Sequence, residues 1–95
     1  MEQGHLYELD FCYEEGQGSS KRPVLIIVVN DERGKAVGLK VTNSGPNNKH
    51  PHRIKVKDSK QANLSDSSHV QYDTYQPFEN VKLKSRGQLS KRDFT

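Results

Sequence analysis

The stretch Val24-Leu25-Ile26-Ile27-Val28-Val29 decides the fold class of this 95-residue chain. All of its residues except Leu25 are β-branched, and Pro23 and the turn signal Asn30-Asp31 bound it. A short, unbroken aliphatic run of this kind predicts a strand that is buried on both faces. Because the backbone groups of a buried strand need hydrogen-bonding neighbours, the rest of the chain must supply a sheet.

Segments on both sides of this run predict the neighbouring strands. We expect them over residues 5–11, 36–42, 52–57, 68–73 and 79–84, with Ile54 and Val56 facing inward. Segments rich in Gly, Asn and Ser, at residues 14–20 and 43–48, predict loops between them. Residues 58–66 have room for one helical turn, and Ser90 with Asp93 predicts a capped helical turn at the C-terminus. Five to six short strands separated by turns predict a mostly β fold, one small barrel or sandwich spanning residues 1–95.

Composition limits the size of the core and favours an intracellular protein. Hydrophobic residues make up 31% of the chain, below the usual share of about 45–50%. Cys12 is the only cysteine, which excludes an internal disulfide and fits a reducing compartment; we expect it to be buried. The sequence has neither a signal-peptide pattern nor an apolar stretch of about 20 residues, so we expect a cytoplasmic protein without a membrane partner.

Positive charge is clustered, although the net charge is only +3. One basic stretch spans residues 49–57 and a second spans residues 82–92, whereas the acidic residues gather near the N-terminus. A clustered positive surface attracts phosphates and favours nucleic acid as a partner. The pair His50 and His52 lacks a nearby Cys or carboxylate ligand set, so we expect no metal site and no cofactor. A role for His69 as a general acid or base stays open.

The order of several short motifs resembles that of the MazF/PemK toxin family over nearly the whole chain. The residues that carry the resemblance are Gly4 and Phe11, Lys21-Arg22-Pro23 before the aliphatic run, Lys40-Val41-Thr42, Asn63-Leu64, Ser68-His69-Val70-Gln71-Tyr72-Asp73, and Gly87-Gln88-Leu89-Ser90. The most specific part is the Arg-Pro entry to an aliphatic strand, followed by a strand that ends in Thr.

The resemblance implies an SH3-like barrel that forms a homodimer, cleaves single-stranded RNA without a metal, and is neutralised by an acidic antitoxin protein. It also implies that Arg22 and Thr42 are the catalytic residues. Their chemistry suits the task, because a guanidinium forks onto two phosphate oxygens and a hydroxyl donates a further hydrogen bond to the charge that develops there. We expect the RNA-binding residues to be Lys21, Arg53, Lys55, Ser68, Gln71 and Asp73.

Two departures from the family pattern leave other functions open. Some relatives carry an Arg where this chain has Gln71, and the C-terminal helix of relatives is reduced here to residues 89–95. These departures favour a catalytically weak or silent barrel that still binds RNA or protein. A third interpretation is an interaction domain that holds a peptide at a sheet edge or groove.

Overall fold

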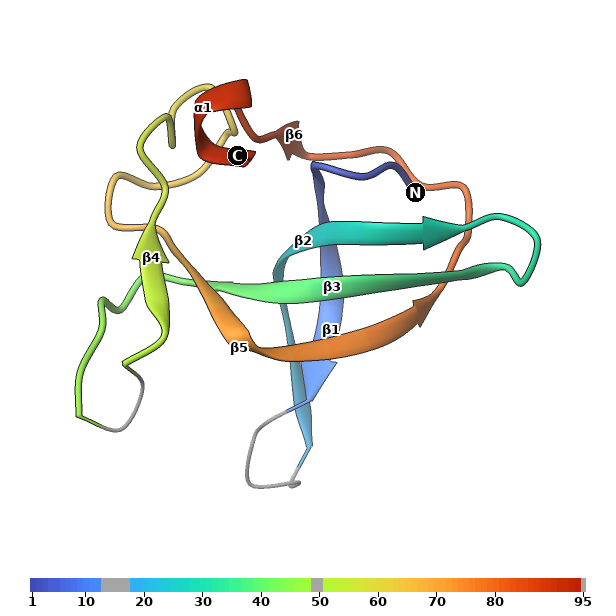
Figure 1. The fold of residues 1–95 in the computed structure, drawn as a ribbon, viewed down its shortest axis with the longest axis horizontal. Coiled ribbons are helices and arrows are strands. Elements are labelled where there is room, and N and C mark those ends of the chain that lie inside the picture. Colours follow the sequence, from blue (N-terminus) through green and yellow to red (C-terminus); the bar gives the residue numbers. More distant parts are fainter. Residues whose placement is uncertain (13–17, 49–50, 95) are drawn as a thin grey trace.

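A single antiparallel sheet dominates the computed structural model, which describes residues 1–12, 18–48 and 51–94. Within these residues the strand order is β4-β5-β3-β2-β1-β6. Figure 1 shows the sheet curled into a half-barrel, with β1 running steeply across β3 and β5. The mostly β class, the strand number and the short C-terminal helical turn are thus confirmed. The elements are β1 (His5–Cys12), β2 (Ser19–Asn30), β3 (Lys35–Thr42), β4 (Arg53–Lys55), β5 (His69–Glu79), β6 (Gly87–Gln88) and α1 (Lys91–Phe94).

Strand β2 is buried on both faces over most of the aliphatic run. Leu25 and Ile27 pack into one hydrophobic core, while Val24 and Ile26 pack into a second core on the other face. Period-two alternation of side chains explains this division. The prediction is wrong for Val28, which is 53% exposed, because a β-bulge between Ile26 and Val28 shifts the register before the strand reaches its hairpin.

Strand β2 separates from β3 at Pro23. The β2–β3 ladder begins at Val24, opposite Lys40, whereas β2 continues to pair with β1 as far as Ser19. Proline has no N–H to donate, so it suits a position where one side of a strand has no hydrogen-bonded neighbour. Strand β3 meanwhile continues beside β5 to Thr42. The sheet therefore opens between the start of β2 and the end of β3.

The segment between β4 and β5 covers the first core and is tied to the C-terminus. Val56 and Ala62 are buried in that core. The carboxylate of Asp93 in α1 accepts hydrogen bonds from the backbone N–H groups of Lys57 (2.8 Å) and Asp58 (2.7 Å). The Asp93 N–H in turn donates to the Ser90 hydroxyl at 3.1 Å, as expected for the predicted cap.

The predicted strand over residues 79–84 is wrong. Strand β5 ends at Glu79, which pairs with the first residue of β3, so no neighbouring strand remains beyond it. Asn80 instead donates its backbone N–H to Gly34 O and its side-chain amide to Asp31. Val81 and Leu83 are left about half exposed.

Three smaller expectations are also wrong. Ile54 is 60% exposed because β4 is the edge strand, and Cys12 is exposed at the end of β1. Residues 58–63 form turns and not a regular helix, because the hydrogen bonds from the N–H groups of Ala62 and Asn63 span different numbers of residues. Lys49, His50 and most of the predicted 14–20 loop lie outside the described residues.

Candidate functional site

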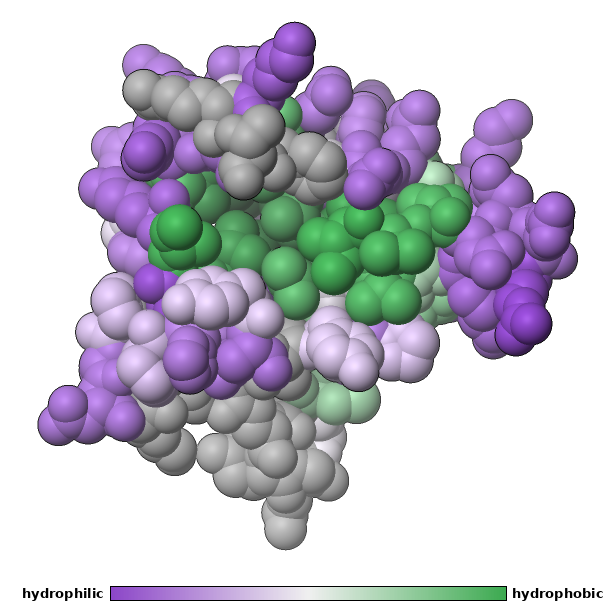
Figure 2. Space-filling model, in the orientation of Figure 1, coloured by the Kyte–Doolittle hydropathy of each residue, from purple (hydrophilic) through white to green (hydrophobic). Residues whose placement is uncertain are grey.

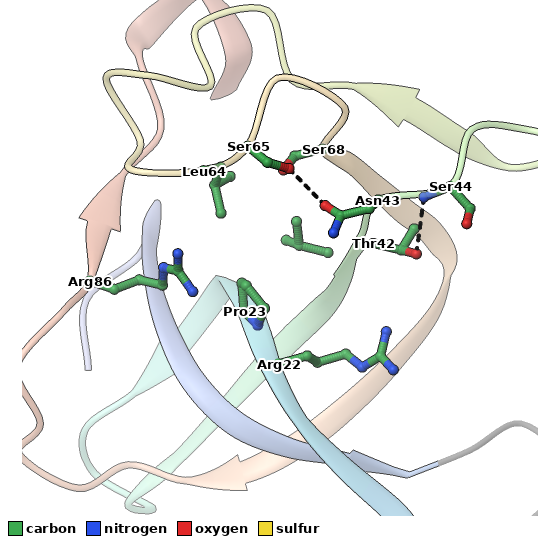
Figure 3. Close-up of a pocket in the computed structure, with 10 residues that line it drawn as sticks. Arg22, Pro23, Thr42, Asn43, Ser44, Leu64, Ser65, Ser68 and Arg86 are labelled. Atoms are coloured by element: carbon green, nitrogen blue, oxygen red, sulfur yellow. Dashed lines mark hydrogen bonds between the residues drawn. The ribbon is translucent and has the colours of Figure 1, made fainter.

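An open pocket of about 490 Å³ lies where β2 and β3 separate. Figure 3 shows its lining side chains, which come from the two parting strands, from the segment after β4 and from the residue before β6. They are Arg22, Pro23, Val41, Thr42, Asn43, Ser44, Leu64, Ser65, Ser68 and Arg86. The pocket is therefore a direct result of the interrupted β2–β3 ladder.

Arg22 and Thr42 face this pocket from its two strand walls. Continuing the register of Val24 and Lys40 would place Arg22 opposite Thr42. Arg22 is held by β1, where it pairs with Leu9, and Thr42 is held by β5, where it pairs with His69. The two predicted catalytic residues are thus brought together, each on a different ribbon of the sheet.

The polar groups around Thr42 leave its hydroxyl proton available. The Ser44 N–H donates to Thr42 Oγ1 at 3.4 Å, so this oxygen acts as acceptor and its O–H can donate to a ligand. Across the mouth of the pocket, Ser65 Oγ donates to Asn43 Oδ1 at 2.8 Å and lies 3.1 Å from Ser68 Oγ. Figure 3 shows the link between Asn43 and Ser65 closing one end of the site.

Arg86 is a pocket residue that sequence analysis placed only in a general basic stretch. Its guanidinium forms an ion pair with Glu8 and donates from Nη2 to Asn63 O at 2.9 Å. Its backbone N–H pairs with Leu6 O, which fixes its place beside β1. The position before Gly87 gave no local signal, because the pocket forms only when β6 returns to β1.

The predicted RNA-binding residues fall into two groups. Ser68 lines the pocket together with Arg22 and Thr42. The others lie outside its lining: Lys21 and Asp73 are exposed, Lys55 is exposed on β4, Arg53 is half-buried on β4, and Gln71 is buried on β5.

Two guanidinium groups belong to the described lining of the pocket, and one of them, that of Arg86, is already paired with Glu8. Arg22 and Arg86 are the ionisable members of its described lining, and the remaining polar members are hydroxyl and amide side chains. Among residues 1–12, 18–48 and 51–94, no three His, Cys, Asp or Glu side chains gather as a metal-binding group. In the same part of the chain, no helix is long and apolar enough to cross a membrane.

Comparison with known proteins assigns the chain to a family. The family model described as PemK-like, MazF-like toxin of type II toxin–antitoxin system matches residues 2–95. No individual curated protein and no solved structure matches the chain at a significant level. A toxin of this kind is one half of a toxin–antitoxin pair, so the match implies an antitoxin partner. The chain belongs to the PemK-like, MazF-like toxins of type II toxin–antitoxin systems.

Proposed function

We propose that this toxin is a cytoplasmic endoribonuclease that cleaves single-stranded RNA, with Arg22 and Thr42 in place of a metal ion. The observation that carries the proposal is the meeting of these two side chains in one open pocket whose described lining contains no acidic side chain. The pocket lies in a chain whose family consists of toxins. Both groups donate hydrogen bonds to anionic oxygens, which is what a phosphodiester undergoing attack requires.

The proposed reaction is an internal transesterification. The ribose 2′-oxygen forms a bond to phosphorus as its proton leaves to solvent, and the bond between phosphorus and the 5′-oxygen breaks as that oxygen takes up a proton. The products are a 2′,3′-cyclic phosphate and a 5′-hydroxyl, without a net oxidant or co-reactant. The Arg22 guanidinium forks onto the non-bridging oxygens, whose charge rises in the transition state, and the Thr42 hydroxyl donates one further hydrogen bond.

The test is to incubate a long, single-stranded RNA with the purified protein in EDTA and to analyse the fragment ends. We expect discrete fragments that carry 5′-hydroxyl and cyclic phosphate ends. A matched DNA strand should stay intact because it lacks the 2′-hydroxyl. Cleavage of the DNA strand, or cleavage that needs added divalent metal, would contradict the proposed mechanism.

A second candidate function is a barrel that binds RNA or protein without cleaving it. It is favoured by Gln71, a neutral residue that is only 1% exposed, at a position where the family resemblance leads us to expect an Arg in some members. In the same assay this function would appear as RNA that is retarded on a native gel but remains uncut.

We also propose that the toxin is a homodimer that binds an acidic antitoxin segment. Figure 2 shows a band of hydrophobic side chains across the face on which β2 lies in Figure 1. Val28 on β2 is 53% exposed. An exposed apolar surface of this kind is typical of a protein–protein interface. Symmetric dimers are the commonest closed assembly, and the surplus of basic residues suits an acidic partner.

The dimer is checked by analytical ultracentrifugation of the purified protein. At micromolar concentration we expect a single species of twice the 10.8 kDa chain mass. Val28→Asp places a charge at this exposed position of β2 and should shift this species toward the monomer. Glu32→Gln, in the neighbouring hairpin turn, is the control and should leave it dimeric. A monomer for the unmodified chain would contradict the proposal.

A further inference from the structure

Arg53 is a guanidinium that neutral groups hold beside the pocket. Its Nε donates to the side-chain oxygen of Gln71 at 3.0 Å, and its Nη1 reaches the backbone oxygen of Ser44 at 3.5 Å. Within the described residues no carboxylate contacts it. The guanidinium therefore keeps its full positive charge, and of its five N–H groups several stay available for a ligand.

Gln71 is built to orient Arg53 without neutralising it. The two residues are directly opposite each other on β5 and β4. The Gln71 side chain is buried, and a buried amide needs hydrogen-bond partners. A carboxylate in this place would cancel the charge of Arg53, whereas the amide oxygen only fixes the plane of the guanidinium. An ordered and uncompensated cation points to binding rather than to stability.

Arg53 is continuous with the pocket. Thr42, His69 and Lys55 form one cross-strand row, and Lys40, Gln71 and Arg53 form the next row on the same face of the sheet. Since neighbouring strands lie about 4.8 Å apart, β4 lies roughly 10 Å from β3, which carries Thr42. Ser44, the acceptor for Arg53, is itself part of the pocket lining.

We infer that Arg53 forms a second phosphate subsite, positioned by Gln71, which binds a phosphodiester flanking the one in the pocket. This inference rests on the proposed function and extends it: the substrate is an RNA strand that continues past the scissile linkage across β5 and β4. Lys55 adds charge on the same face of β4. A phosphodiester chain presents anionic groups at regular spacing, which matches a second fixed guanidinium beside the first site.

The test measures binding of a short oligonucleotide, cut by the unmodified protein at a mapped position, in which a 2′-deoxy nucleotide blocks that cut. Neutral methylphosphonate linkages are placed one at a time along the strand. Arg53→Gln should weaken binding about tenfold, as expected for hydrogen bonds to a charged group, and lower the salt slope by about one phosphate contact. One flanking methylphosphonate should weaken RNA binding by the unmodified protein but should not weaken binding by Arg53→Gln any further.

Two further variants separate position from charge. Arg33→Gln removes the same charge at the exposed β2–β3 hairpin and should behave like the unmodified protein. Gln71→Met has a side chain of similar volume and leaves the charge of Arg53 in place. The salt slope of binding should therefore equal that of the unmodified protein, whereas the effect of that single methylphosphonate on binding should disappear. Thermal melts report whether Gln71→Met folds. If Gln71→Met does not fold, Arg53→Gln remains as the test of the subsite, because Arg53 lies on the edge strand β4.

The outcomes distinguish the two proposals. An unmodified protein that neither binds nor cleaves RNA would overturn the proposed function. Normal cleavage with Arg53→Gln indistinguishable from Arg33→Gln would overturn the subsite only. A loss confined to binding of a poly-glutamate peptide would also overturn it and would assign Arg53 to an acidic protein segment instead.

Discussion

Arg22→Ala should lower the rate of RNA cleavage by about 10²–10³, the usual cost of removing one electrostatic donor from a transition state. The reason is that Arg22 lines the pocket together with Thr42, at the point where β2 leaves β3. Arg22→Lys should recover only part of the rate, because an ammonium cannot fork onto two phosphate oxygens. Thr42→Val keeps the side-chain shape without the hydroxyl and should slow cleavage with less effect on binding.

The measurement is single-turnover cleavage of one labelled RNA in EDTA, with thermal melts for each variant. Because Arg22 is half-buried, the melts separate a lost catalytic group from a lost fold. Arg33→Ala, at the exposed β2–β3 hairpin, removes the same charge outside the pocket lining and serves as the matched control. Equal rates for the unmodified protein and Arg22→Ala would place the active site elsewhere.

Gly87→Ala should destabilise the protein by about 3 kcal/mol, at the upper end of typical costs for overpacking. A Cβ at Gly87 would lie 2.1 Å from the backbone oxygen of Ala62, and a backbone atom cannot move aside as a flexible side chain can. Gly87 pairs with the buried Leu6, so β6 cannot shift without opening the first core. For a domain of this size the melting temperature should fall by roughly 12 °C or more.

Thermal unfolding of Gly87→Ala and Gly45→Ala checks this prediction. A Cβ at Gly45 would meet only the His69 ring, at an ordinary distance of 3.5 Å, so this control should melt close to the unmodified protein. Gly87→Ala should also impair cleavage at temperatures where it stays folded, because the segment it displaces carries Leu64 and Ser65 into the pocket. Melting of both variants at the same temperature would show that β6 is loosely packed.

The sequence allowed the centre of the sheet and part of the pocket to be predicted. Most of the aliphatic run in β2 can be buried only between neighbours on both faces of the strand, although Val28 stays exposed. Arg22-Pro23 directly precedes this run, where β2 leaves β3, and Thr42 ends β3. The edges were less predictable, because alternation in residues 52–57 does not reveal that β4 has a neighbour on one side only, which leaves Ile54 exposed. Residues 79–84 have strand composition, but they extend beyond the strand that would have paired with them.

Side chains that reach the site from distant parts of the chain could not be predicted in the same way. Arg86 enters the pocket because β6 pairs with β1, a contact between opposite ends of the sequence. The hydrogen bond between Arg53 and Gln71 depends on the register of β4 against β5, which a three-residue strand does not encode by pattern. Register and long-range pairing are set by the packed fold as a whole.

The interruption of the sheet at Pro23 has a thermodynamic consequence. Arg22 belongs to the ribbon of β1 and β2, and Thr42 belongs to the ribbon of β3 and β5. An anion that both side chains hold would act as a crosslink in place of the missing backbone ladder, joining two ribbons that have no direct β2–β3 pairing at this end. Binding of the anion would then raise the free energy of unfolding, since any ligand that binds only the native state stabilises that state. The increase in the melting temperature with ligand concentration would therefore report the affinity of the site.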